Sequence, residues 1–277
     1  MASYDSSDLT HHPRDHDIVR EASDMSPRLI FETLRRSGEE ELERPAKALW
    51  FSGMAAGILI SFSVLGEALL RAYLPDAAWR YIVENLGYSF GFLLVILGRM
   101  QLFTENTITT VVPVLTQRSW GAVGRTGKLW VIVLAANVVG AFAVASFLAY
   151  APVLNEPVFA AFTDLSQHAT GMPPIEGLLR GVPAGVLIAA LVWMLPSAKG
   201  NEIALIVLFT WLIALGDFTH IVAGSVEMAF LMVQGQLPWT QAVFGFFGPV
   251  FLGNVLGGTV IFTLLAWAQI KADVDQR

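Results

Sequence analysis

The chain has 277 residues, of which 55% are hydrophobic and only 14% are charged, and its mean hydropathy is +0.58. Soluble domains carry about 25% charged residues, so this composition excludes an ordinary soluble domain and indicates a protein that crosses a lipid bilayer several times. The net charge of −6 comes largely from the tail and the loops, and the lack of cysteine excludes disulfides, thiol catalysis and Cys-ligated metals. We expect no cofactor, no metal and no nucleic-acid partner.

The N-terminal part of the chain is polar, in contrast to the apolar remainder. Seven of the seventeen Lys and Arg residues lie within the first 47 positions. Leu29, Ile30 and Leu34 share one side of a segment that is otherwise rich in charges, which is typical of a surface helix. We therefore predict a cytoplasmic tail over residues 1–44 that includes an amphipathic helix at about 27–44.

Six segments of the remaining chain are long and apolar enough to cross a membrane, which takes about 20 residues. They are residues 46–74, 83–116, 129–152, 174–197, 202–233 and 240–270, and polar residues interrupt the second and the fifth. The longest connection, 153–173, has room for a short interfacial helix. We predict an all-α, six-helix transmembrane domain over 45–272, followed by a cytoplasmic C-terminal end over 273–277.

The distribution of basic residues predicts the orientation of this domain. The tail, the connections after the second and fourth spans and the C-terminal end carry most of the Lys and Arg, whereas the opposite connections offer few. Because short cytoplasmic loops are enriched in Lys and Arg, and because six crossings place both termini on one side, we expect both termini in the cytoplasm.

The two halves of the domain share an internal repeat. Three matches occur in the same order: Gly53–Ile60 with Gly181–Ile188, Phe103-Thr104 with Phe218-Thr219, and Asn137–Gly140 with Asn254–Gly257. The first span starts inside and the fourth starts outside, so the two three-helix repeats are inverted. Inverted halves with broken helices at matching places are typical of a channel or transporter whose site lies between the repeats.

Each broken span contains polar, non-helical sequence at membrane depth. Hydrocarbon offers no partner to a freed backbone amide, so such sequence must line a cavity or pack inside the protein. We predict that the new half-helices begin near Asn106 or Thr107 and near Val222, with N-termini that attract an anion. Thr104, Thr219 and Asn106 either line the pathway or cap the freed backbone.

His220 is the histidine that lies inside a membrane segment. Its ordinary pKa near 6.5 suits it to exchange a proton with a passing weak acid, and the alternative is a neutral imidazole that holds the broken loop together. Asp217 either orients that imidazole or binds a cation. Glu105 and Arg99 either line the pathway or pair with other charges. Glu67 and Glu227 are expected near span ends, without a role in the pathway.

Small and amide side chains in the third and sixth spans indicate helix packing. Asn137, Gly140, Asn254 and Gly257 are the residues concerned. Small residues let membrane helices approach closely, and an asparagine can bridge to a broken neighbour.

Taken together, these motifs resemble the formate/nitrite transporter family over about residues 45–270. The likeness rests on Leu102-Phe103-Thr104, Lys128-Leu129-Trp130, Asn137–Gly140, the break at His220 and Gly253–Gly258. The resemblance implies an aquaporin-like fold and a homopentamer in which each protomer holds its own pore. It also implies that His220 is the central pore histidine with Thr104 as its partner, and that hydrophobic constrictions lie at Tyr88, Phe92, Phe103 and Ile213.

The chain departs from the family pattern at several positions. Thr219 replaces the acid usually found before the pore histidine, and Ala169 lies near the place of a vestibule lysine, while Arg99, Glu105 and Asp217 are additions. This set is similar to an uncharacterised branch of the family in the bacterial inner membrane. The resemblance implies a channel for a weak-acid anion such as formate or nitrite, and the added acids favour the alternative of a cation or small neutral solute. No nucleophile or metal motif completes an enzyme site.

Overall fold

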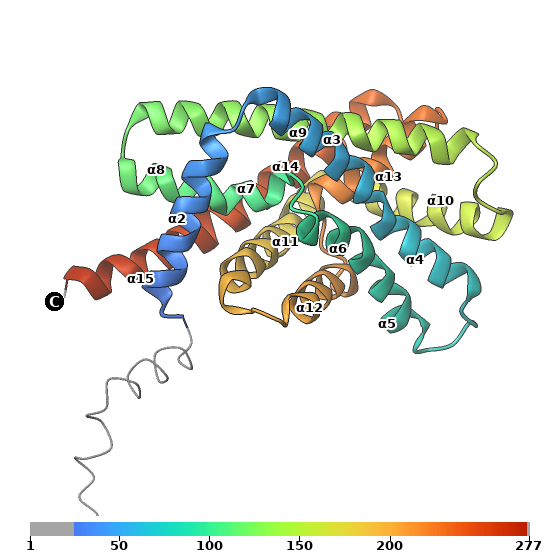
Figure 1. The fold of residues 1–277 in the computed structure, drawn as a ribbon. Helices are drawn as coiled ribbons and strands as arrows, with labels where there is room; N and C mark the ends of the chain where they lie inside the picture. The colour runs from blue at the N-terminus through green and yellow to red at the C-terminus, as the bar shows by residue number, and fades with distance from the viewer. Residues whose placement is uncertain (1–24, 276–277) are drawn as a thin grey trace, which may run out of the picture.

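The computed structural model describes residues 25–275 of the chain and the side chains of residues 25–272. The beginning of the predicted tail and the last two residues of the predicted C-terminal end lie outside the described residues. The described part of the chain is helical and contains no strand (Figure 1).

The first half of the domain contains the helices up to residue 150. They are α2 (Pro27–Glu43), α3 (Ala46–Leu59), α4 (Ser61–Tyr73), α5 (Arg80–Glu84), the 3₁₀ turn η2 (Asn85–Tyr88), α6 (Ser89–Leu97), α7 (Phe103–Thr109), α8 (Val111–Gln117) and α9 (Trp120–Tyr150). Helices α3 and α4 follow each other almost without interruption and form one apolar segment of 28 residues. The chain leaves the helical conformation between α6 and α7, where the first break is predicted.

The second half begins after residue 155. It contains α10 (Glu156–Gly171), α11 (Pro174–Met194), the 3₁₀ turn η3 (Leu195–Ser197), α12 (Glu202–Leu215), α13 (Ile221–Val233), the π-helical η4 (Gln241–Phe247), α14 (Gly248–Val255), the π-helical η5 (Leu256–Thr263) and α15 (Leu264–Asp275). The second predicted break is present between α12 and α13, and the short helix expected in the longest connection is α10.

Five helical segments of the described chain are long and apolar enough to cross a membrane. They are Ala46–Tyr73, Arg80–Leu97, Trp120–Tyr150, Pro174–Ser197 and Gln241–Ala272. The fifth predicted span is instead divided between two shorter apolar helices, α12 and α13. The break therefore shortens each part below the length of a full crossing.

Helix α2 packs across one end of the domain, over α7 and α8 (Figure 1). Its buried apolar side chains are Ile30, Phe31 and Leu34, whereas Leu29 is 52% exposed, so the predicted apolar face was wrong at Leu29. The outer face carries charges: hydrogen bonds from the Arg35 and Arg36 guanidinium groups lower the pKa of the Glu32 carboxyl to about 2. Helix α2 approaches α7 closely, since a Cβ added to Gly38 would lie 2.0 Å from the Thr109 carbonyl oxygen.

Glycines bring two pairs of helices into backbone contact, and the two pairs occupy matching positions in the halves. A Cβ added to one of these glycines would lie about 2 Å from a carbonyl oxygen: Gly57 from Asn137, Gly140 from Met54, Gly185 from Asn254 and Gly257 from Val182. No larger side chain fits at such a contact. The glycines therefore set the distance between α3 and α9 and between α11 and the α14–η5 segment.

Substitution of Gly140 tests this packing. We expect Gly140→Ala to lower the free energy of unfolding by about 1–3 kcal/mol, because the added methyl group would have to push α3 away from α9. The matched control is Gly127→Ala on the same helix, where a Cβ meets nothing within 4 Å. Thermal unfolding of both variants in detergent measures the difference, and equal melting temperatures would contradict the close contact.

Candidate functional site

Asn137 on α9 holds the first break in place. Its Oδ1 accepts a hydrogen bond from the Phe103 backbone N–H at 3.0 Å. Its Nδ2 donates to the carbonyl oxygens of Gly53 at 2.7 Å and Gln101 at 2.8 Å. One fully buried side chain thus satisfies backbone groups of α3, of the break and of α7, for which the membrane interior offers no water.

Asn254 on α14 makes the same three contacts at the second break. Its Oδ1 accepts from the Ile221 N–H at 2.8 Å, and its Nδ2 donates to the carbonyl oxygens of Gly181 and Thr219, both at 2.9 Å. Both asparagines therefore bind the first N–H of a half-helix and the carbonyl two residues before it. The two breaks are therefore held by the same set of hydrogen bonds.

These contacts correct the predicted alignment of the two breaks. Phe103 occupies the position of Ile221, and Gln101 that of Thr219, so the repeat is offset by 118 residues here and Phe103 does not correspond to Phe218. The two Phe-Thr pairs look alike in the sequence but do not occupy equivalent positions. Asn137 binds backbone groups of Gln101 and Phe103, whereas Asn254 binds those of Thr219 and Ile221.

The start of the first half-helix differs from the prediction. Helix α7 begins at Phe103, three residues before Asn106, because Leu102 is extended and Asn137 accepts the Phe103 N–H. Helix α13 begins at Ile221, within one residue of the predicted start near Val222. The first amide of each half-helix is bonded to an asparagine, so these two amides are not free to bind an anion.

His220 and Thr104 meet where the two breaks approach each other. The His220 Nε2 lies 2.7 Å from the Thr104 Oγ1, and both residues are at least 98% buried. The His220 Nδ1 accepts a hydrogen bond from the Ala223 N–H at 3.3 Å and thereby caps α13. An imidazole that accepts at Nδ1 carries its hydrogen at Nε2, so we assign Nε2 as the donor to Thr104.

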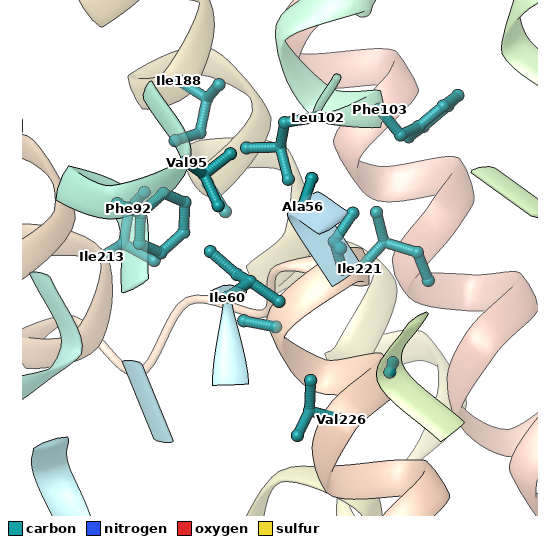
Figure 2. Packing of buried hydrophobic residues seen from close by; sticks show 14 of the residues in the cluster. Ala56, Ile60, Phe92, Val95, Leu102, Phe103, Ile188, Ile213, Ile221 and Val226 are labelled. Carbon is teal, nitrogen blue, oxygen red and sulfur yellow. The ribbon is translucent and has the colours of Figure 1, made fainter. Parts of the chain in front are cut away.

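An aromatic ring packs against the imidazole, and further apolar side chains lie next to that ring. The Phe92 ring meets it edge-on, with the ring centres 5.0 Å apart, and the Tyr88 ring lies 5.3 Å from that of Phe92. Ile213 is fully buried on α12, which packs against α6, and Figure 2 shows it beside Phe92. Three of the four predicted constriction residues thus gather on one side of His220.

Phe103 is not part of this group. Its ring packs against those of Trp130 and Phe251, with centres 5.4 Å and 5.5 Å away, and Figure 2 shows it well apart from Phe92. Leu102, the preceding residue, is fully buried and lies nearer to that apolar group. The Phe103 ring therefore lies apart from the other three predicted constriction residues, against α9 and α14.

Two predicted polar residues of the breaks bind backbone or neighbouring side chains. The Thr219 Oγ1 donates to the Gly177 carbonyl at 2.7 Å. The Asn106 Nδ2 donates to the Gln101 Oε1 at 3.1 Å and to the Leu102 carbonyl at 3.2 Å. Of the two interpretations that the sequence allowed, these contacts are the ones expected of backbone capping.

Asp217 does not orient His220. Its carboxylate lies 3.0 Å from the His168 Nε2 and accepts a hydrogen bond from the Arg180 Nη1 at 3.0 Å, and its φ of +53° turns the backbone sharply. The carboxylate therefore joins the break to α10 and α11. Sequence reasoning missed both partners, and the one signal for them was that His168 and Arg180 lie on the same side of the predicted membrane domain.

Glu105 lies on the opposite side of the breaks, near α2. It lines a cavity of about 470 Å³ together with Glu41, Arg99 and Gln101. Its Oε1 is buried without a hydrogen-bond partner among the described residues, and no ion pair joins it to exposed Arg99. The Gln101 Nε2 instead donates to the Glu41 carboxylate at 2.7 Å, which ties α2 to the first break.

A second cavity, of about 280 Å³, adjoins His220 on the side of Asp217. Its charged lining also includes Glu67, Arg71 and Glu227, so the two glutamates that were expected near span ends face this cavity. Among the described residues, no group of three or more His, Asp or Glu is placed to hold a metal ion.

A buried histidine between two broken membrane helices, with a cavity on either side of the breaks, defines a helical membrane protein of the channel type. A model of the formate/nitrite transporter family matches residues 28–268, and the chain therefore belongs to this family.

Three similar proteins extend this comparison. The inner membrane protein YfdC of Escherichia coli strain K12 is 42% identical over 248 residues, which cover 90% of this chain and 80% of YfdC. An FNT family ion channel of known structure has a TM-score of 0.73 at 19% identity and covers 88% of this chain and 98% of its own. A pentameric formate channel with formate bound has a TM-score of 0.68 at 19% identity, with 81% and 97% covered.

Removal of the Asn254 amide tests how the breaks are held. We expect Asn254→Ala to destabilise the protein by about 2–5 kcal/mol, because it leaves one buried N–H and two carbonyl oxygens without a partner. The control is Asn201→Ala, since the exposed Asn201 side chain makes no hydrogen bond within the described chain. Denaturation in detergent measures both variants, and equal stability would show that the break does not depend on the asparagine.

Proposed function

We propose that this protein is a channel for a small monovalent solute, which passes between the two cavities by way of His220 and Thr104. The observation that carries the proposal is the hydrogen bond between these two residues, at the place where both breaks meet. Membership of a family of transporters supports it. The apolar group of Tyr88, Phe92 and Ile213 would form the constriction on one side.

We further propose six crossings arranged as two inverted three-helix repeats, as in aquaporins. The matching contacts of Asn137 and Asn254 support this arrangement, as do the matching glycine contacts. Helices α7 and α8 then complete the second crossing, and α12 and α13 together make the fifth. The pentameric assembly of the formate channel with formate bound supports a homopentamer here.

The bacterial inner membrane is the proposed location. The similar protein YfdC is named an inner membrane protein, and this chain has helices of sufficient length and hydropathy. The concentration of Lys and Arg in the tail and in alternate connections supports cytoplasmic N and C termini. By this orientation α2 lies on the cytoplasmic side.

The proposed mechanism for a weak-acid anion such as formate or nitrite uses the imidazole as a proton donor or hydrogen-bond donor. The apolar rings at the constriction disfavour a charged solute, whereas a neutral acid can pass them. His220 would stabilise the anion as it crosses by donating its Nε2–H hydrogen bond, or it would first take up a second proton from water in the cavity, give a proton to the anion and return to the neutral imidazole. Thr104 would accept the Nε2–H hydrogen bond again once the solute has left. The dipole of α13, whose N-terminus is at His220, adds an attraction for negative charge.

A channel for a cation or small neutral solute is the second candidate. The observation that favours it is the Oε1 of Glu105 in the cavity below α2, which has no hydrogen-bond partner within residues 25–272, whereas Asp217 is balanced by Arg180 and His168. Glu105→Gln would raise the flux of an anion under the first candidate and reduce a cation current under the second.

An enzyme that uses Asp217 and His220 together is not supported, because each is bonded to other residues. A closed sensor whose tail binds a partner would pass no solute. Flux through the full chain and through a chain without residues 1–44 separates this possibility from a channel.

Replacement of His220 tests the proposed pathway in proteoliposomes that contain formate, nitrite, hydrosulfide, acetate, ammonium or sodium. We expect His220→Asn to slow the transported weak acid by about tenfold or more and to flatten its pH dependence, since general acid catalysis contributes about 10²–10⁴-fold. Asparagine can still cap α13, so the fold is retained. An unchanged rate and pH profile would overturn the role of His220.

Thr104→Val and Thr116→Val form a matched pair for the same assay. Thr104 bonds the pore histidine, whereas the Thr116 hydroxyl donates to carbonyl groups of its own helix. Only the first substitution is expected to reduce flux.

A further inference from the structure

Glu227 lies in the same cavity as His220 and on the same side of α13. Seven residues separate them, which is nearly two helical turns or about 10 Å along the axis. Gly224 lies between them and also lines the cavity, and the Phe246 ring packs against it, since a Cβ added to Gly224 would lie 2.4 Å from the Phe246 Cζ. A solute that enters this cavity is therefore exposed to both His220 and the Glu227 carboxyl group.

Arg71 and Asp217, two other charged residues of this cavity, have close partners. The Arg71 guanidinium donates to the Glu84 Oε1 at 3.1 Å and 2.7 Å, and the Arg80 Nε lies 3.3 Å from the Glu84 Oε2. Asp217 is paired with Arg180 on α11. These groups therefore present little uncompensated charge to a solute.

The Asp217 carboxylate also meets His168 from α10, and two tyrosines, Tyr81 and Tyr88, complete the polar lining on the other side. None of these groups forms an ion pair or hydrogen bond with Glu227 in the described part of the chain.

Glu227 and Glu67 are the carboxyl groups that stay unbalanced. Glu227 makes no ion pair and no hydrogen bond with any described residue. Glu67 is 91% buried on α4, and its nearest cation is the Arg71 Nη2 at 3.9 Å, which is only 2.7 Å from Glu84. Of the described residues that line this cavity, Glu227 and Glu67 are thus the carboxyl groups without a close ion pair. The Lys or Arg residue in the lining is Arg71, which is paired with Glu84.

We propose that Glu227, assisted by Glu67, sets the charge selectivity of the pore on this side of His220. A free anion is repelled there, and the solute reaches His220 as a neutral acid or as a monovalent cation. The inference deepens the proposed function and rests on it. The acids that disfavour an anion in this cavity are then Glu227 and Glu67, whereas Asp217 is paired with Arg180 and His168.

The test compares Glu227→Gln with wild type in proteoliposomes loaded with nitrate, a strong-acid anion that is not protonated near neutral pH. We expect the substitution to raise nitrate flux by up to about tenfold, and the increase to grow toward alkaline pH, because glutamine cannot take on the negative charge that the carboxyl group carries once it ionises in this partly desolvated path. Glu67→Gln/Glu227→Gln should raise it further, and Glu227→Asp should leave it low. Asp164→Asn is the control, since Asp164 is exposed on α10 and lies outside the cavity lining.

Formate flux in the same vesicles separates this inference from the proposed function. If wild type passes formate or ammonium but Glu227→Gln and the double variant keep the nitrate flux of wild type, the charge filter is overturned and the channel stands. If wild type passes none of these solutes at any pH between about 5 and 8, the range in which an unperturbed imidazole changes its charge, both proposals are overturned. Equal elution of all variants in detergent excludes misfolding as the cause of a change.

Discussion

The structure depends on how two interruptions of membrane helices satisfy their backbone groups without water. A freed N–H or C=O in hydrocarbon costs several kcal/mol, so a break persists only where protein supplies each partner. Asn137 and Asn254 do so with the same three hydrogen bonds. Asn137 on α9 bonds the first break and α3, and Asn254 on α14 bonds the second break and α11. Each asparagine thus joins three segments of its half of the protein at one buried point.

The glycine contacts make these hydrogen bonds possible. An amide side chain is short, and it reaches the carbonyl of a neighbouring helix only when the two backbones nearly touch. Gly57 and Gly140 bring α3 and α9 to this distance, and Gly185 and Gly257 do the same for the second half. The position of His220 follows, because its own helix begins at the residue whose N–H Asn254 holds.

The buried polar groups of this protein have different roles, which depend on the residues that they bind. Asp217 is the acid closest in sequence to His220, yet its bonds to Arg180 and His168 make it a structural tie between α10, α11 and the break. Glu227 is seven residues away and has no such partner among the described residues, so its carboxyl group acts on whatever enters the cavity. Separation in sequence was therefore a poor guide to which acid faces the solute.

The membrane class, the two breaks and the repeated asparagines could be predicted from the residues because each is a local property. Apolar length and polar interruption are visible within one segment, and the family likeness rests on short motifs at those same places. The exact start of α7, the 118-residue register of the breaks, the displacement of Phe103, the partners of Asp217 and the cavity position of Glu227 and Glu67 were decided by the tertiary structure. Each of these depends on a contact with another helix, such as the bond between Asn137 and Phe103 across 34 residues, and no local pattern specifies such a partner.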